Sequence, residues 1–330
     1  MRAGLIFDID KYIALGPNET SREVGHDHAM SGRILSINAS VAREMAISET
    51  DVTYATAGDL ELKLDIFRPE GASKRCAILY FHGGGWRGGS KAAMHNYAKA
   101  MAEHGFTGVA VQYRLLGQAP WPAQIHDVKS AVRWVRAHAA ELGVDEDKII
   151  VWGASAGAHL SLLAAGTGDL PALEGDGPNQ GVSSKANGVI ALFPPTGFFH
   201  GAATATHTSS GAGLLGEGYS AEAAREASPI TYAGADYPPA LFFHGTNDRV
   251  VHHSASVAMV TALREARAPA DLHLFHGHTH EFLTIPSVRA IAIMEAAYFL
   301  ERSVIDPAKF KAEAEEFNMF ARPRPAPAAS

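Results

Sequence analysis

Residues 149–160, Ile-Ile-Val-Trp-Gly-Ala-Ser-Ala-Gly-Ala-His-Leu, decide the architecture of this chain. The run Ile149–Trp152 is apolar and mostly β-branched, which predicts a strand buried on both faces, and a helical pattern begins at Ala158. Between them, Ser155 has a glycine two residues to either side, Gly153 and Gly157. A sharp strand-to-helix turn needs both glycines, because a side chain at either position would collide with the neighbouring backbone. We therefore predict that Ser155 projects from the carboxyl end of a strand as a nucleophile, with an ordinary helix start as the alternative.

Further runs of strand length, most of them apolar, recur along the chain. They are Ala77–Phe81, Gly108–Tyr113, Gly188–Phe193, Ala240–Phe243 and Asp271–Phe275. Helical patterns lie between or after them, at Gln124–Leu142, Ser254–Arg267 and Pro286–Arg302. This alternation is typical of a mostly parallel central sheet with helices on both faces. We therefore expect one α/β domain over residues 51–303.

The start of this domain has a different pattern. Two alternating runs, Val52–Thr56 and Leu62–Arg68, lie on either side of Gly58-Asp59 and predict an antiparallel hairpin at an edge of the sheet. Residues 1–50 are an N-terminal extension with one expected helix, Ile37–Ile47. Two interpretations of this extension stay open, a lid element over the site and packing at an edge.

Two further segments differ from the alternating core. Residues 166–228 are rich in Gly, Ala, Thr and Ser, and apart from one strand they predict loops above the sheet that form part of a small lid. Residues 304–330 predict a C-terminal helix and then, at Arg322–Ser330, a tail with too little apolar content to fold.

The composition excludes several classes of function. A net charge of -7 without any block of Lys or Arg offers no surface for nucleic acid. The single cysteine, Cys76, excludes an intrachain disulfide and a multi-cysteine zinc site. No stretch of eighteen apolar residues occurs, and the acidic residues near the N-terminus do not fit an export segment. We therefore expect a cytoplasmic protein without a membrane span.

A run of three glycines, His82-Gly-Gly-Gly-Trp86, follows the strand Ala77–Phe81. Such a run lets the backbone turn its N–H groups toward open space, which is what stabilisation of a tetrahedral oxyanion requires. We expect the N–H groups of Gly83, Gly84 and Ala156 to form this oxyanion hole. A functionless flexible loop is one alternative. A phosphate cradle is another, but no Lys-Ser/Thr pair follows the glycines.

Five motifs occur in a characteristic order: His82–Trp86, Tyr113-Arg-Leu, Asp127–Val135, Val151–Leu160 and His244–Asp248. Together they resemble the hormone-sensitive-lipase-like and bacterial feruloyl-esterase-like carboxylesterases, over roughly residues 51–300. The resemblance implies the α/β-hydrolase fold, a lid, and ester hydrolysis through an acyl-enzyme without a cofactor. The chain departs from that family at Ala158, where a second glycine is usual.

The acid of a catalytic triad is expected after a late strand. Asp248 directly follows the strand Ala240–Phe243 in a turn, and the chain order Ser, Asp, His is the order that this fold uses. An ordinary turn aspartate is the alternative. Asp236 precedes that strand and Asp271 begins the next one, so both are expected at the wrong end of the sheet.

Three alternating histidines follow the last strand, at His276, His278 and His280. A metal site is the main competing interpretation, but no His-Glu-x-x-His helix completes a zinc shell. The family ends in His-x-Phe, which His280-Glu281-Phe282 matches, so the resemblance implies that His280 is the base. His278 stays the second candidate, and His276 is expected to be structural or exposed. We expect no metal.

Aromatic residues at the same edge of the sheet are candidates for the substrate pocket, namely Trp86, Phe193 and Phe198, with core packing as the alternative for each. The expected partner is a small to medium carboxylic ester. Two other functions stay open: an amidase such as an arylformamidase with the same triad, and a non-catalytic ligand-binding protein of the same fold. The sequence permits a homodimer through an edge strand or the last helix, but no feature specifies one.

Overall fold

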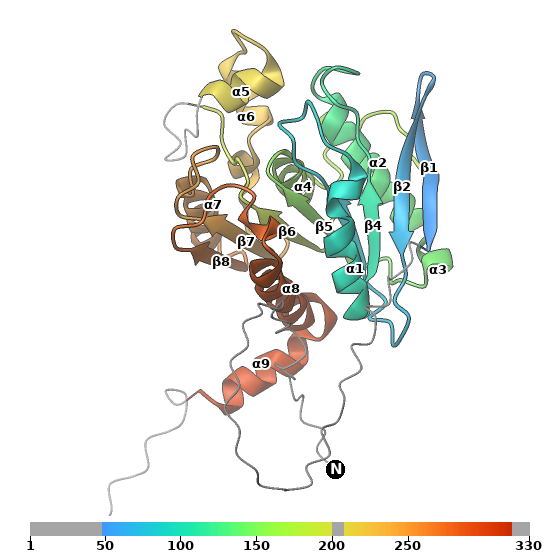
Figure 1. The fold of residues 1–330 in the computed structure, drawn as a ribbon, viewed down its shortest axis with the longest axis vertical. Coiled ribbons are helices and arrows are strands. Elements are labelled where there is room, and N and C mark those ends of the chain that lie inside the picture. The colour runs from blue at the N-terminus through green and yellow to red at the C-terminus, as the bar shows by residue number, and fades with distance from the viewer. Residues whose placement is uncertain (1–47, 200–207, 319–330) are drawn as a thin grey trace, which may run out of the picture. The chain divides into compact units, whose positions relative to one another are not determined.

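The strands of the chain form one mixed sheet in the computed structural model, which describes residues 48–199 and 208–318 (Figure 1). The strand order is β1-β2-β4-β3-β5-β6-β7-β8. Strands β3 to β8 pair in parallel, whereas β1 and β2 form an antiparallel hairpin at one edge. The strands are β1 (Glu49–Ala57), β2 (Leu60–Phe67), β3 (Ala77–Phe81), β4 (Thr107–Val111), β5 (Ile149–Ala154), β6 (Gly188–Leu192), β7 (Ala240–Gly245) and β8 (Ala270–Phe275). Each predicted strand and the edge hairpin are thus confirmed.

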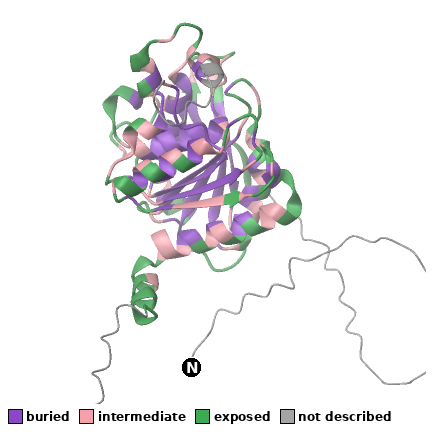
Figure 2. Ribbon diagram, turned by 90° about the vertical axis from the view of Figure 1, so that its left-hand side faces the viewer, coloured by how far each residue is buried: buried purple, intermediate pink, exposed green. Residues whose placement is uncertain are grey.

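The middle of the sheet is buried on both faces, as the continuous apolar runs predict. Every residue of β3, β4 and β6 is buried, and Figure 2 shows that the middle of the sheet is coloured as buried. The edge strand β1 exposes more than half of its residues fully or in part. Strands that are covered on both sides must be apolar at every position, whereas an edge strand alternates.

Helices cover both faces of the sheet. In Figure 1, α1 (His95–Glu103) and α8 (Pro286–Leu300) lie on the near face, and α2 (Ala123–Ala137) and α4 (Ala156–Gly166) lie on the far face. Helix α7 (Ser254–Glu265) packs against the last two strands. The predicted architecture, a mostly parallel sheet between two layers of helices, is confirmed.

The helix predicted over Gln124–Leu142 is interrupted, because α2 ends at Ala137 and a separate turn, α3 (Ala139–Leu142), follows. At the break, His138 stacks on Trp134 with ring centroids 4.1 Å apart, and its Nδ1 lies 2.8 Å from the Trp134 carbonyl oxygen. The backbone N–H of His138 also donates to that carbonyl oxygen, so backbone and ring of His138 together cap the end of α2. A one-dimensional pattern does not reveal such a break.

Segment 166–228 contains more regular structure than the predicted loops. Besides β6 it holds α5 (Thr208–Leu215) and α6 (Ala221–Glu226), which lie above the sheet in Figure 1. An ion-pair cluster fastens the loop before β6 to α2: Glu174 lies 2.6 Å from the Lys129 ammonium and 2.5 Å from the Arg133 guanidinium. Both cations are buried, so loss of Glu174 would leave two buried charges without this partner.

The remaining elements are short or terminal. In the described part of the chain, four 3-10 turns and a π-helical turn connect the helices and strands: η2 (Lys91–Met94), η3 (Pro171–Leu173), η4 (Pro229–Tyr232), η5 (Phe282–Thr284) and η6 (Glu301–Ile305). Helix α9 (Pro307–Glu316) follows, within the segment where the sequence predicts a C-terminal helix. The helix predicted at Ile37–Ile47 and the tail Arg322–Ser330 lie outside the described residues. Among residues 48–199 and 208–318, no helix has the length and apolar character needed to cross a bilayer.

Candidate active site

Ser155 lies in a tight turn between β5 and α4. Its backbone has φ 50° and ψ -115°, a left-handed conformation that a residue with a side chain rarely adopts. A Cβ atom on Gly153 would lie 2.2 Å from the carbonyl of Gly157, and a Cβ on Gly157 would lie 2.1 Å from the carbonyl oxygen of Phe81. Neither position therefore accepts a side chain, which is why the serine stands between two glycines.

Replacement of Gly157 by alanine should destabilise the fold. Because the added methyl group would meet the backbone of β3, which cannot move aside, we expect a loss of roughly 3 kcal/mol or more in the free energy of unfolding. Urea denaturation measures this loss. Gly117→Ala is the matched control: Gly117 is exposed with no atom within 4 Å of the place that an added methyl group would take, so its change should stay within about 1 kcal/mol. Equal stability of the two variants would contradict the steric argument.

Three side chains from three loops meet at this turn. His280 Nε2 lies 3.0 Å from Ser155 Oγ, and His280 Nδ1 lies 2.6 Å from Asp248 Oδ2. Ser155 follows β5, Asp248 follows β7, and His280 follows β8, so all three stand at the carboxyl ends of parallel strands. The structure thus brings together the serine, acid and base that the sequence suggests, in the geometry of a Ser-His-Asp triad.

Asp248 is held as a carboxylate although its side chain is fully buried. Burial by itself raises the pKa of this group, but hydrogen bonds from His244, His280 and the Val251 N–H outweigh burial and hold the pKa well below its usual range. A negatively charged partner at Nδ1 orients the His280 ring and stabilises its protonated form. The site therefore has a permanently ionised acid behind its imidazole.

The other two histidines of the cluster face elsewhere. The ring of His278 packs against Phe282, with centroids 5.2 Å apart, and its carbonyl oxygen accepts a hydrogen bond from the Asn247 N–H. His276 is exposed. Within the described part of the chain, no group of three or more His, Cys, Asp or Glu side chains is arranged to hold a metal ion. The alternation of the three histidines places only His280 toward Ser155.

The two aspartates that the sequence analysis places at the wrong end of the sheet, Asp236 and Asp271, lie away from Ser155. Asp236 is exposed in the segment before β7, and Asp271 forms an ion pair with Arg302 at the start of β8. Both positions are near the amino ends of their strands, as the sequence indicates.

The glycine loop is fixed at its base by His82. The ring of this buried histidine stacks on Tyr113 at 4.5 Å, and its Nδ1 lies 2.7 Å from the carbonyl oxygen of Gly83. Burial lowers the pKa of His82, so its ring is neutral at pH 7. Gly84 has φ 116°, and a Cβ there would lie 2.3 Å from the carbonyl oxygen of Gly88. Only glycine can make this turn beside Ser155.

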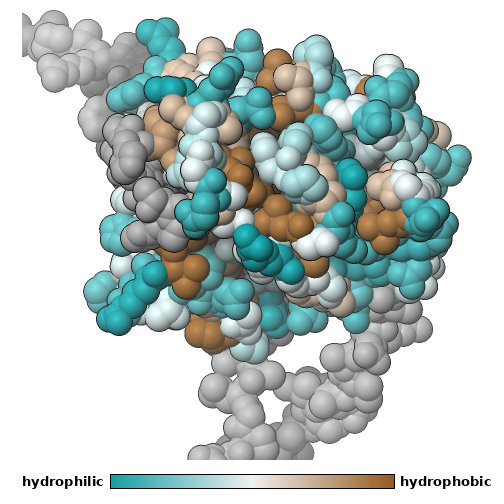
Figure 3. Space-filling view, turned by 90° about the horizontal axis from the view of Figure 1, so that it is seen from above, coloured by the Kyte–Doolittle hydropathy of each residue, from teal (hydrophilic) through white to brown (hydrophobic). Residues whose placement is uncertain are grey.

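A cavity of about 430 Å³ adjoins the serine. Its wall is mostly apolar and is made by Gly84, Gly85, Trp86, Ser155, Ala156, Pro195, Val250, Val251, His280 and Glu281. Figure 3 views the molecule from above and shows apolar side chains gathered among more hydrophilic ones at this end. Of the predicted oxyanion residues, Gly84 and Ala156 line the cavity. Gly83 does not, although a Cβ on it would lie 3.3 Å from the Ser155 Cβ.

Two of the three predicted pocket aromatics do not line this cavity, which corrects the sequence assignment. Phe193 is buried with its ring 4.6 Å from that of His280, and Phe198 is buried between Trp86 and His159. Both support residues of the site from behind. The cavity residues that the sequence did not suggest, such as Pro195 and Val250, come from loops after β6 and β7, and no motif marks them.

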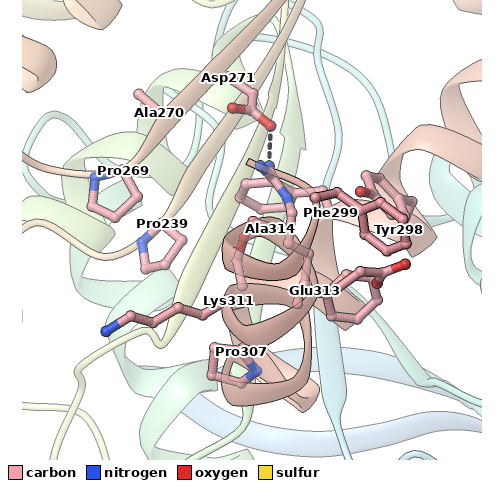
Figure 4. Close-up of a pocket in the computed structure, with 14 residues that line it drawn as sticks. Pro239, Pro269, Ala270, Asp271, Tyr298, Phe299, Pro307, Lys311, Glu313 and Ala314 are labelled. Carbon is pink, nitrogen blue, oxygen red and sulfur yellow. Dashed lines mark hydrogen bonds and ion pairs between the residues drawn. The ribbon is translucent and has the colours of Figure 1, made fainter. Parts of the chain in front are cut away.

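A larger cavity, of about 910 Å³, lies elsewhere (Figure 4). Its lining includes Pro239 and Pro269, which directly precede β7 and β8, and Tyr298 and Phe299 near the end of α8. These positions are at the amino ends of the strands, whereas Ser155, Asp248 and His280 follow carboxyl ends. None of these three residues lines the larger cavity. The size of a cavity therefore does not identify the reactive site in this protein.

Comparison with known proteins agrees with this geometry. The sequence model of the BD-FAE family matches residues 64–263. The esterase LipQ of Mycobacterium tuberculosis is 32% identical over 278 residues, which cover 77% of this chain and 62% of LipQ. The chain thus spans less than two thirds of the length of this curated relative.

Solved structures cover more of the chain. A thermophilic esterase of Thermogutta terrifontis superposes with a TM-score of 0.69 at 31% identity, covering 79% of this chain and 94% of that one. The same esterase 2 phosphonylated by sarin also gives a TM-score of 0.69, at 30% identity, with coverage of 79% and 97%.

Proposed function

Because this chain belongs to the BD-FAE family and has the α/β-hydrolase fold, we propose that it is a serine carboxylesterase that hydrolyses small to medium carboxylic esters. The observation that carries the proposal is the unbroken hydrogen-bonded series from Ser155 Oγ through His280 to Asp248, with separations of 3.0 Å and 2.6 Å. The cavity of about 430 Å³ beside Ser155 supports a substrate of modest size.

In the proposed acylation step, His280 Nε2 accepts the proton of Ser155 as its oxygen attacks the ester carbonyl carbon. The carbonyl oxygen becomes an oxyanion, and the bond to the alcohol oxygen then breaks as His280 returns the proton to the leaving alcohol. Asp248 stays ionised throughout and stabilises the protonated imidazole, which its low pKa supports. No step uses a metal or an organic cofactor.

The oxyanion is proposed to lie against the N–H groups of Gly83, Gly84 and Ala156. Ala156 begins α4, so its N–H points out of the positive end of a helix. Each donor in such a hole is worth roughly 3 kcal/mol of transition-state stabilisation. In deacylation, His280 Nε2 accepts a proton from water as the water oxygen attacks the acyl carbonyl carbon. The bond to Ser155 Oγ then breaks as His280 returns the proton to that oxygen, and the carboxylic acid is released.

A fluorophosphonate probe and a series of p-nitrophenyl esters test the proposal together. We expect stoichiometric labelling of Ser155 and turnover that falls beyond a limiting acyl length, because the cavity beside Ser155 has a volume of only about 430 Å³. The matched p-nitroanilides separate an esterase from an amidase. Neither labelling nor turnover would indicate a ligand-binding protein instead.

Of the residues that the structure describes, one with a charged side chain besides the triad lines the cavity, Glu281. It is exposed, and among the described residues no cation pairs with it. A carboxylate at the mouth should favour a cationic alcohol group over its neutral isostere, and Trp86 adds an aromatic wall beside it.

We therefore expect choline esters to be turned over with a kcat/KM roughly two- to fivefold above that of the isosteric 3,3-dimethylbutyl esters at low salt. Glu281→Gln should remove this preference without lowering turnover of the neutral ester. Glu313→Gln, which neutralises an exposed carboxylate on α9, is the control and should change neither value. A preference that survives in Glu281→Gln would show that the charge acts from elsewhere.

A further inference from the structure

A fourth polar side chain, His244, contacts the acid of the triad from inside the protein. It lies on β7 and is fully buried. Its Nε2 lies 3.2 Å from Asp248 Oδ2, the same oxygen that meets His280, and 2.9 Å from the carbonyl oxygen of Val251. Its Nδ1 lies 2.8 Å from the hydroxyl oxygen of Ser256 on α7.

These neighbours determine which ring nitrogen of His244 carries the proton. Nε2 faces two acceptors, a carboxylate and a carbonyl, neither of which has a proton to give, so Nε2 must be the donor. A neutral ring then has an unprotonated Nδ1, which accepts the hydroxyl proton of Ser256. Ser256 is itself fully buried, so this hydroxyl has a defined partner rather than bulk water.

With His244 included, both oxygens of Asp248 are fully used. Oδ1 accepts the N–H groups of Val250 and Val251, at 2.8 Å and 2.9 Å. Oδ2 accepts from His280 on one side and from His244 on the other. Without the His244 donor, His280 would be the one remaining side chain at Oδ2, and the Val250 and Val251 N–H groups would hold the carboxylate through Oδ1 only.

From this geometry we infer that His244, oriented by Ser256, is a positioning residue that holds Asp248 Oδ2 in line with His280 Nδ1. The inference rests on the proposed serine-hydrolase mechanism, because it assigns His244 a task within that mechanism. Its effect reaches the reacting atoms only through Asp248 and His280. Loss of the donor should therefore reduce the turnover rate and leave substrate binding almost unchanged.

Two substitutions of similar polarity separate this role from simple core packing. The side-chain amide nitrogen of glutamine can occupy the place of Nε2, whereas that of the shorter asparagine can only occupy the place of Nδ1. We expect His244→Gln to keep kcat within about threefold of the native value and His244→Asn to lose roughly 10- to 100-fold, with KM within about twofold in both. Rates are expressed per active site titrated with a fluorophosphonate, so that misfolded protein does not count.

Two serine substitutions, Ser256→Ala and Ser161→Ala, provide a milder test that leaves the imidazole of His244 in place. Ser256→Ala removes the hydroxyl that donates to His244 Nδ1 and should lower kcat per titrated site by roughly three- to tenfold. The control is Ser161→Ala, since Ser161 is also fully buried but its hydroxyl has no hydrogen-bond partner among the described residues. This control should keep the native kcat.

The outcomes are distinguishable. If His244→Asn and His244→Gln have equal kcat per titrated site, or Ser256→Ala matches Ser161→Ala, the positioning role is wrong. If His244→Asn does not fold, the comparison of Ser256→Ala with Ser161→Ala still tests the positioning role of His244. If the native protein itself shows neither labelling nor turnover, the proposed function fails first, and that result is seen before any variant is made.

Discussion

Replacement of Ser155 by alanine is expected to lower kcat for a p-nitrophenyl ester by about four to six orders of magnitude, with KM almost unchanged. The oxygen that attacks the substrate is lost, while the oxyanion donors and the cavity remain. Alanine also fits the turn, because only the hydroxyl is removed and the left-handed backbone is already supported by its neighbours. Steady-state kinetics at high enzyme concentration measure the residual rate.

The control for Ser155→Ala is a substitution at Ser161, a buried serine on α4. Ser161→Ala removes a hydroxyl six residues further along the chain and should leave kcat at the native value. Both variants should unfold at nearly the same urea concentration. Substantial turnover by Ser155→Ala, after contaminating esterase has been excluded by labelling, would mean that another residue is the nucleophile.

The second large loss of kcat is expected when His280, the proposed base, is replaced. His280→Ala should lower kcat by roughly four orders of magnitude or more, because members of a triad act as a unit. Its labelling by a fluorophosphonate should slow to a similar extent, since the probe also needs an activated serine. Labelling rates can be followed even when turnover is too slow to measure.

His278→Ala is the matched comparison, two residues away in the same loop. The His278 side chain packs on Phe282, and its contribution to the loop between β8 and η5 is a backbone carbonyl that alanine retains. We expect kcat within about threefold of the native value and a loss of stability of about 1 kcal/mol. A larger kinetic loss at His278 than at His280 would reverse the assignment of the base.

Much of the fold follows from the sequence because buried parallel strands leave a strong pattern. Runs such as Ala77–Phe81 have no polar position, and each became a strand with its predicted bounds nearly unchanged. Helix α1 was missed although its buried residues Tyr97, Ala98, Met101 and Ala102 recur at helical spacing, because its nine residues fall short of the roughly 11 or more over which such a periodicity is read.

The candidate site could be predicted where chemistry requires a particular residue type. Glycines stand where the backbone is crowded, and serine, aspartate and histidine follow strand ends. The pocket walls could not be predicted in this way, because Val250 and Pro195 would satisfy many environments equally well. Nor could His244 be connected with Asp248 from spacing, since the link depends on a ring orientation that Ser256 and Val251 impose from outside the motif.

The close approach of Gly157 to the Phe81 carbonyl limits which residues the turn at Ser155 accepts. It ties the turn of Ser155 to β3, the strand that precedes the glycine loop, and both strands lie in the interior of the sheet, so the proposed nucleophile and the proposed oxyanion donors are fixed relative to each other. The acid and the base are borne instead by β7 and β8, the last two strands toward the opposite margin. We therefore expect substitutions in the loops after β7 and β8 to be tolerated better than substitutions at Gly153 or Gly157.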